Sequence, residues 1–169
     1  MKHVAVLTGG MSAERDVSLS SGDAVYKALT ELGYRVSKVD AQADMVSQVL
    51  TLQPDAVFNA LHGRWGEDGC VQGALEVVGI PYTHSGVLAS ALAMDKPMAK
   101  KVFVAHGLQV PGGRIFTKKQ MLAKEPMARP YVVKPGNEGS SVGVMIVLPE
   151  SNVHFSETNW SFGDEVLVE

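Results

Sequence analysis

The sequence has little of several features that mark particular classes of protein. Its 169 residues include one cysteine, Cys70, which excludes an internal disulfide and is typical of a reducing compartment. No apolar run approaches the roughly 20 residues that span a membrane, and the first residues lack the three regions of a secretory signal. There is no basic cluster either, since 15 Lys and Arg stand against 18 Asp and Glu. We therefore expect a cytoplasmic protein with no membrane and no nucleic-acid partner.

The first part of the chain alternates strand-like and helix-like segments. Ser20 and Asp23 resemble a capping box at the start of the first helix, and Gly33 is suited to its end. Strands that alternate with helices at this spacing predict βαβ units and a parallel sheet. The expected strands are residues 3–8, 35–39, 56–61 and 80–83, and the expected helices are residues 18–32, 45–50 and 71–78.

The pattern changes after residue 94. One further helix is followed by short strand candidates, with turns rich in proline and glycine between them. This composition predicts a second, α+β unit, so we expect one domain at residues 1–94 and another at residues 95–169. The helix is expected at residues 96–106 and the strands at residues 114–117, 131–134, 142–148 and 165–169.

Two polar, glycine-rich loops follow predicted strands of the first unit, where ligands bind in open α/β sheets. In the loop at 9–18, Glu14 is suited to holding an ammonium group and the helix start to holding a carboxylate. A solvated loop is the favoured interpretation of this loop by itself. In the loop at 62–69, His62 either faces a ligand or has a structural role, and the spacing is not that of a zinc-protease motif.

A third loop, at 134–143, begins with Lys134 and continues with small residues. Backbone N–H groups and hydroxyls in such a loop can surround phosphate oxygens. The loop is not a Walker A motif, because it has no Gly-Lys-Ser/Thr and leads into a strand. Lys96 also flanks a turn-rich loop, which favours phosphate binding over an ordinary hairpin.

Four stretches form an ordered pattern: GGMSAERDVS at 9–18, HGRWGEDGCVQG at 62–73, SGVLASALAMDK at 85–96 and KPGNEGSSVG at 134–143. Together they resemble the D-alanine–D-alanine ligases of the ATP-grasp superfamily. The resemblance implies a parallel-sheet, Rossmann-like (pre-ATP-grasp) substrate-binding domain, followed by an incomplete α+β ATP-grasp domain. It also implies ATP-dependent ligation of two D-alanines through an acyl phosphate, for peptidoglycan synthesis.

The resemblance assigns substrate and catalytic roles in all three loops. Glu14 would bind the ammonium group of the first D-alanine, and Val17 and His62 would also contact that substrate. Ser140 would hydrogen-bond to Glu14 and help to orient the substrates. The catalytic residues implied in this way are Glu14, His62 and Ser140.

The resemblance also assigns ATP binding. Lys96 and Lys134 would contact the phosphates, Ser140 and Ser141 would cover them, and Glu169 would begin the adenine-binding segment. The family uses Mg²⁺ or Mn²⁺, whose ligands lie beyond residue 169, so no metal ligand is expected here. The family is usually homodimeric, which makes a second copy an expected partner besides D-alanine and ATP.

One departure from the family pattern is His84, where many relatives carry glycine. Three interpretations stay open. The chain is the amino-terminal part of such a ligase, stops at Glu169 on a predicted strand, and is inactive alone. It is instead a non-catalytic binding or dimerisation module. Or it belongs to a ligase whose second substrate is D-lactate or D-serine.

Overall fold

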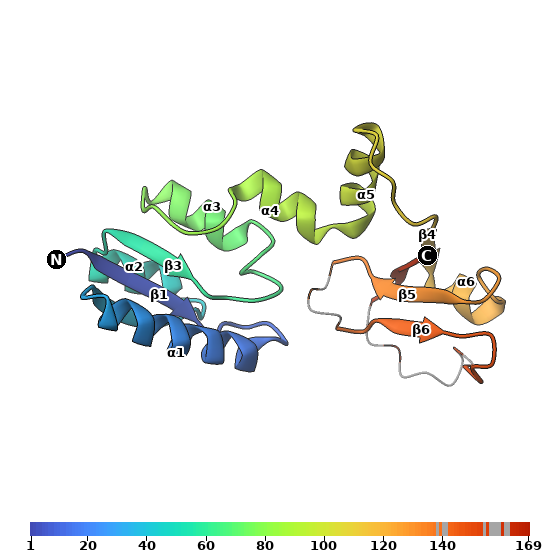
Figure 1. Ribbon diagram of the computed structural model, residues 1–169, viewed down its shortest axis with the longest axis horizontal. Helices are drawn as coiled ribbons and strands as arrows, with labels where there is room; N and C mark the ends of the chain where they lie inside the picture. The colour runs from blue at the N-terminus through green and yellow to red at the C-terminus, as the bar shows by residue number, and fades with distance from the viewer. Residues whose placement is uncertain (138, 140–141, 154, 156–159, 161–162) are drawn as a thin grey trace. The chain divides into compact units, whose positions relative to one another are not determined.

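The computed structural model describes residues 1–137, 139, 142–153, 155, 160 and 163–169. The chain divides into two compact units, Met1–Ala91 and Leu92–Glu169, each with its own sheet (Figure 1). Each unit also has its own cluster of buried hydrophobic residues. Within the described residues, no helix combines the length and the apolar character needed to cross a membrane. Ser140 and Ser141, two of the predicted site residues, lie outside the described residues.

The first unit is a parallel sheet with helices on both faces. Its strands lie in the order β2-β1-β3, and their register aligns Leu7 of β1 with Val39 of β2 and Asn59 of β3. The carboxyl ends of the three strands therefore share one edge. Figure 1 shows α1 on one side of this sheet and α3 on the other. The elements are β1 (His3–Thr8), α1 (Arg15–Glu31), β2 (Arg35–Asp40), α2 (Met45–Leu52), β3 (Ala56–Asn59), α3 (Cys70–Val77) and the start of α4 (Val87–Met94), whose last three residues belong to the second unit.

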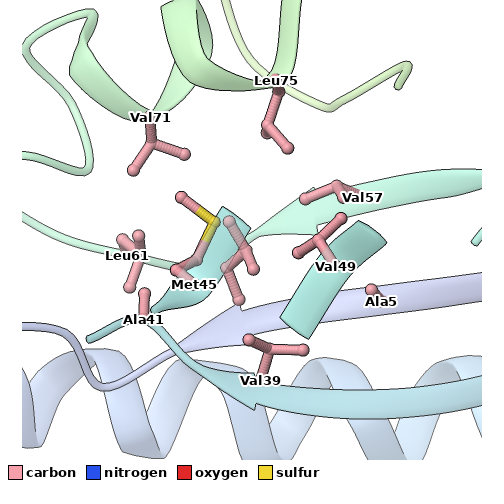
Figure 2. Packing of buried hydrophobic residues seen from close by; sticks show 10 residues of the cluster. Ala5, Val39, Ala41, Met45, Val49, Val57, Leu61, Val71 and Leu75 are labelled. Carbon is pink, nitrogen blue, oxygen red and sulfur yellow. The ribbon is translucent and has the colours of Figure 1, made fainter. Parts of the chain in front are cut away.

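The core of the first unit lies between the sheet and the pair α2 and α3 (Figure 2). Leu7 and Val57 from the strands meet Val49 of α2 and Leu75 of α3, and all four are at most 1% exposed. Burial of side chains of this size stabilises the fold by about 1.5–3 kcal/mol each. The same packing holds the carboxyl edge of the sheet at a defined distance from both helices.

Helix α1 starts earlier than the sequence predicts, but it ends where predicted. It begins at Arg15 rather than near residue 18, and Glu14 occupies the N-cap position without a side-chain capping bond. At its end Gly33, with φ +82°, donates to the carbonyl of Thr30, and Tyr34 donates to that of Leu29. These two bonds form a Schellman motif, which needs a residue that tolerates positive φ.

The second unit is an antiparallel sheet in the order β4-β7-β5-β6. Its buried cluster includes Phe116, Met121, Tyr131 and Val168. Together with the first unit this confirms the predicted fold class, a parallel α/β unit followed by an α+β unit. The elements are α5 (Lys96–Ala105), β4 (Arg114–Thr117), α6 (Lys118–Ala123), β5 (Tyr131–Pro135), β6 (Met145–Val147) and β7 (Glu165–Val168).

Candidate functional site

Glu14 lies at the carboxyl edge of the parallel sheet, directly before α1. The residue is 5% exposed, and neither carboxylate oxygen has a hydrogen-bond partner among the described residues. A Cβ atom added to Gly63 would lie 2.8 Å from Glu14 Oε1, so glycine at 63 allows this close approach. A buried, unpaired carboxylate is costly, because burial removes its water without supplying a partner. The arrangement therefore suits a ligand that brings a positive charge and N–H donors.

His62 follows β3 on the neighbouring loop, and Ser12 ties this loop to Glu14. Ser12 Oγ donates to the His62 carbonyl at 2.8 Å and accepts the Glu14 backbone N–H at 3.1 Å. The imidazole of His62 lies between Ser21 of α1, whose Oγ is 3.0 Å from Nε2, and Glu67, whose Oε1 is 3.9 Å from Nδ1. The structure thus brings together two predicted site residues, Glu14 and His62, from loops that are far apart in the sequence.

Arg15 and Asp40 form a bidentate ion pair beside Glu14, which the sequence analysis did not predict as part of the site. Both nitrogen–oxygen distances are 2.7 Å, and Asp40 also accepts the backbone N–H of Gly10 at 3.1 Å. The hydrogen bonds from Arg15 hold the pKa of the Asp40 carboxyl well below its usual range, against the opposing effect of burial. The pair therefore fixes the loop after β1, and with it the start of α1 where Glu14 lies.

A cavity of about 190 Å³ opens at the same edge, on the side of α2 and α3. Met45, Leu61 and Val71 line it, and Figure 2 shows their side chains around this space. Ser12 and His62 lie on its polar wall. Val17, the other predicted substrate contact, is 51% exposed on the first turn of α1 and does not line this cavity.

In the second unit, the Glu169 carboxylate lies between two lysines. It accepts hydrogen bonds from Lys134 of β5 and from Lys100 of α5. The backbone of Glu169 also exchanges two hydrogen bonds with Val132, which fixes it against β5. Burial acts to raise the pKa of the Glu169 carboxyl, but the two lysines outweigh it and the pKa lies below its ordinary value.

Lys100 is the basic residue that the sequence analysis missed at this place. The sequence could have indicated Lys100, because it follows Lys96 by four residues on α5 and residues four apart share one face of a helix. Lys96 begins α5, and its backbone N–H donates to the carbonyl of Gly136 at 3.1 Å. The start of α5 therefore lies against the beginning of the loop at 134–143.

No group of three or more His, Cys, Asp or Glu side chains within the described ranges is placed to hold a metal ion.

Comparison with known proteins relates the chain to one group throughout its length. The family model "D-ala D-ala ligase N-terminus" matches residues 40–85. D-alanine–D-alanine ligase from Parvibaculum lavamentivorans is 55% identical over 99% of this chain and 56% of its own length. The ligase from Caulobacter sp. strain K31 is 57% identical over 99% of this chain and 53% of its own length. The chain spans about half the length of the curated relatives it matches.

Solved structures agree with these relatives. A crystal structure of the D-alanine–D-alanine ligase from Bacillus anthracis superposes with a TM-score of 0.79 and 33% identity, over all of this chain and 57% of the other. A structure of that enzyme complexed with ATP gives a TM-score of 0.77, 31% identity and 58% coverage of its chain. By fold, the chain is therefore the counterpart of part of an ATP-grasp ligase. Its sequence is similar to that of D-alanine–D-alanine ligases over nearly its whole length.

Proposed function

We propose that the whole protein joins two molecules of D-alanine to form D-alanyl-D-alanine, with ATP as the energy source, for peptidoglycan synthesis. The observation that carries the proposal is the buried Glu14 carboxylate, whose oxygens have no partner among the described residues. An amino acid ammonium group supplies the positive charge and the N–H donors that this carboxylate lacks. The names of the relatives support the same substrate.

In the proposed reaction, an oxygen of the first D-alanine's carboxylate attacks the γ-phosphorus of ATP, and ADP leaves. The acyl phosphate that results is attacked at its carbonyl carbon by the amine of the second D-alanine. The amine nitrogen of the tetrahedral intermediate loses a proton to solvent, and departure of phosphate restores the carbonyl and leaves the amide. Glu14 holds the ammonium group of the first D-alanine, Val17 contacts the same substrate, and His62 lies beside its carboxylate. Phosphoryl transfer depends mainly on such positioning and on neutralising charge.

The lysines of the second unit have the charge that ATP phosphates require. In the proposal, Lys96 and Lys134 contact the phosphates, and Ser140 and Ser141, which lie outside the described residues, cover them. Glu169, which is fixed against β5, begins the adenine-binding segment. The family's Mg²⁺ or Mn²⁺ supplies further charge neutralisation when bound.

Phosphate release by the full-length protein tests the proposal. We expect ATP to be converted to ADP and phosphate only when D-alanine is present, with D-alanyl-D-alanine as the product, and we expect L-alanine to have no effect. The same assay with D-alanine plus D-lactate or D-serine decides the second substrate. Phosphate release that D-alanine does not stimulate, but another amino or hydroxy acid does, would contradict the assignment. The 169-residue chain by itself is expected to show little or no turnover.

Two further properties belong to the proposal. Because the reaction consumes ATP and precedes cell-wall assembly, we place it in the cytoplasm, where it contributes to cell shape. We also propose a homodimer, as the family resemblance implies. The mass of the full-length protein in solution, measured by light scattering, tests this: a monomer at micromolar concentration would contradict it.

A further inference from the structure

His62 is held from three directions by groups of the first unit. Its carbonyl accepts the Ser12 hydroxyl at 2.8 Å, which fixes the backbone. Its Nε2 lies 3.0 Å from Ser21 Oγ, and its Nδ1 lies 3.9 Å from Glu67 Oε1. Both edges of the ring therefore face a polar group of defined position.

Ser21 is placed by the geometry of α1. Glu14, Ser18 and Ser21 are spaced by four and three residues, so they lie along one face of the helix. Ser18 fixes that face against the end of the sheet, because its Oγ donates to the carbonyl of Ala60 at 2.8 Å. The hydroxyl of Ser21 is consequently brought to the loop that carries His62.

Glu67 is oriented by the backbone of the same loop. Its Oε2 accepts the Gly63 N–H at 2.6 Å, which leaves Oε1 toward the imidazole. At 3.9 Å this oxygen is too far from Nδ1 for a direct hydrogen bond, so it acts through its charge. A negative charge on this side of the ring favours the proton on Nδ1. The lone pair on Nε2 is then left to accept the Ser21 hydroxyl proton.

We propose that Ser21 and Glu67 are positioning residues for His62, which hold its neutral imidazole in the tautomer protonated at Nδ1 and fix the plane of the ring. The proposal deepens the proposed function, and its importance for catalysis rests on that function, because His62 is there the residue beside the reacting carboxylate. A free imidazole side chain in water prefers the opposite tautomer, with its proton on Nε2. The His62 ring beside the substrate therefore keeps Nδ1 as its hydrogen-bond donor and Nε2 as its acceptor.

Long-range ¹H–¹⁵N spectra of the 169-residue chain test the tautomer directly. We expect the neutral His62 ring to be protonated at Nδ1. Substitution Glu67→Gln, which keeps the shape of the side chain and removes its charge, should lower the ratio of the Nδ1–H to the Nε2–H form by roughly tenfold. A wild-type ring protonated at Nε2, or a ratio that Glu67→Gln does not change, would overturn the role of Glu67.

Ser21 is tested in the same spectra, against a matched pair in the same unit. His3 Nε2 lies 3.0 Å from Ser37 Oγ, which reproduces the serine contact of His62. Within the described residues, no carboxylate lies within ion-pair distance of the His3 ring. We expect Ser21→Ala to shift the Nε2 signal of His62 alone, and Ser37→Ala to shift that of His3 alone. A His62 Nε2 signal that is unaffected by Ser21→Ala would overturn the role of Ser21.

These spectra need neither ATP nor D-alanine, so their outcome is separate from that of the proposed function. Kinetics of the full-length protein supply the second readout: Glu67→Gln should lower kcat while leaving the KM for ATP unchanged. An unchanged kcat would overturn positioning for catalysis, even with the expected tautomer. If the wild-type protein shows no D-alanine-dependent turnover at all, the proposed function fails while the tautomer result stands.

Discussion

Glu14 combines a cost in folding with a use in binding. Its carboxylate is buried without a hydrogen-bond partner among the described residues, which costs free energy. A bound cation offsets this cost. Substitution Glu14→Gln should therefore raise the free energy of unfolding of the chain. It should also raise the KM for the first D-alanine in the full-length protein by roughly 10–100-fold, since a charged hydrogen bond contributes about 1.5–3 kcal/mol. Urea unfolding and steady-state kinetics measure the two effects.

Glu31→Gln is the control for this change, because Glu31 is an exposed carboxylate at the other end of α1. We expect neither quantity to change in that variant. Glu14→Gln with an unaltered KM would show that Glu14 does not hold the substrate's ammonium group.

The Arg15–Asp40 pair makes stability depend on pH. Because the pKa of Asp40 is lower in the folded chain than the usual value of about 3.9, the pair stabilises the fold above that pH. The contribution is lost as the pH falls toward the folded pKa. Both side chains are about two-fifths exposed, so Asp40→Asn should cost only about 0.5–1 kcal/mol at pH 7.

The difference between wild type and Asp40→Asn should shrink below about pH 4, as measured by urea unfolding at pH 7, 5 and 3. Asp23→Asn breaks the more exposed pair with Lys38 and should cost less at every pH. A cost for Asp40→Asn that does not vary with pH would contradict the assignment of this pKa.

His84 has a backbone conformation that favours glycine. Its φ is +90°, a region that residues with a side chain rarely adopt, and the residue is exposed. His84→Gly should relieve strain of about 1–3 kcal/mol, less about 0.5–1 kcal/mol for the freer unfolded chain. We expect a net rise in the free energy of unfolding, measured in urea. A loss of stability would show that the His84 side chain makes a contribution larger than the strain.

Single residues were predictable from sequence where they belong to a contiguous motif. Glu14 and His62 stand in such motifs, and the structure places their loops together. The partners Ser21, Asp40 and Lys100 were not predicted as part of a site. Each contacts a partner that is distant in the sequence; Asp40, at the end of β2, pairs with Arg15 from 25 residues away. A local pattern of residue types does not predict such a long-range contact.

At the level of elements, two helix glycines have opposite roles. Gly22 of α1 faces the sheet, and a Cβ atom there would overlap the Thr8 hydroxyl, which itself donates to Ser18. Gly73 of α3 has no atom closer than 3.8 Å to such a Cβ. Gly22→Ala should cost about 1–3 kcal/mol through overpacking, whereas Gly73→Ala should add about 0.5–1 kcal/mol through helix propensity.

Urea unfolding of the two alanine variants measures these opposite changes, and each variant is the control for the other. Equal changes in the free energy of unfolding would mean that helix propensity alone determines the effect of both substitutions. Gly22 would then not lie in close contact with Thr8.

Most elements follow from apolar periodicity, and the exceptions have physical causes. Residues 80–83 form only an isolated bridge between Tyr82 and Val57, because the adjoining turns leave too little extended chain for a ladder. Helix α4 was not predicted: its residues are apolar on nearly every side, so they show no amphipathic period. The short helix α6 was also missed, although Thr117 and Gln120 form a capping box that the sequence contains.

At the scale of the molecule, the two units have separate buried clusters. Leu75 is fully buried in the first, and Met121 is 2% exposed in the second. Each substitution by alanine should cost about 2–5 kcal/mol. We expect Leu75→Ala to shift the unfolding reported by Trp65, in a Trp160→Phe background. Met121→Ala should shift that reported by Trp160, in a Trp65→Phe background.

The crossed measurements are the controls: Leu75→Ala read at Trp160, and Met121→Ala read at Trp65, should show smaller shifts. Identical shifts at both tryptophans would show that the two clusters unfold as one cooperative system.

The position of Glu169 between Lys100 and Lys134 has a consequence for salt. The Glu169 carboxylate acts as an internal counterion, because it is paired with the ammonium groups of Lys100 and Lys134. Under the proposed function, an arriving phosphate exchanges with this carboxylate instead of releasing dissolved anions from a bare lysine. The affinity for ATP should then fall less steeply with ionic strength than it would if Lys134 had no carboxylate partner.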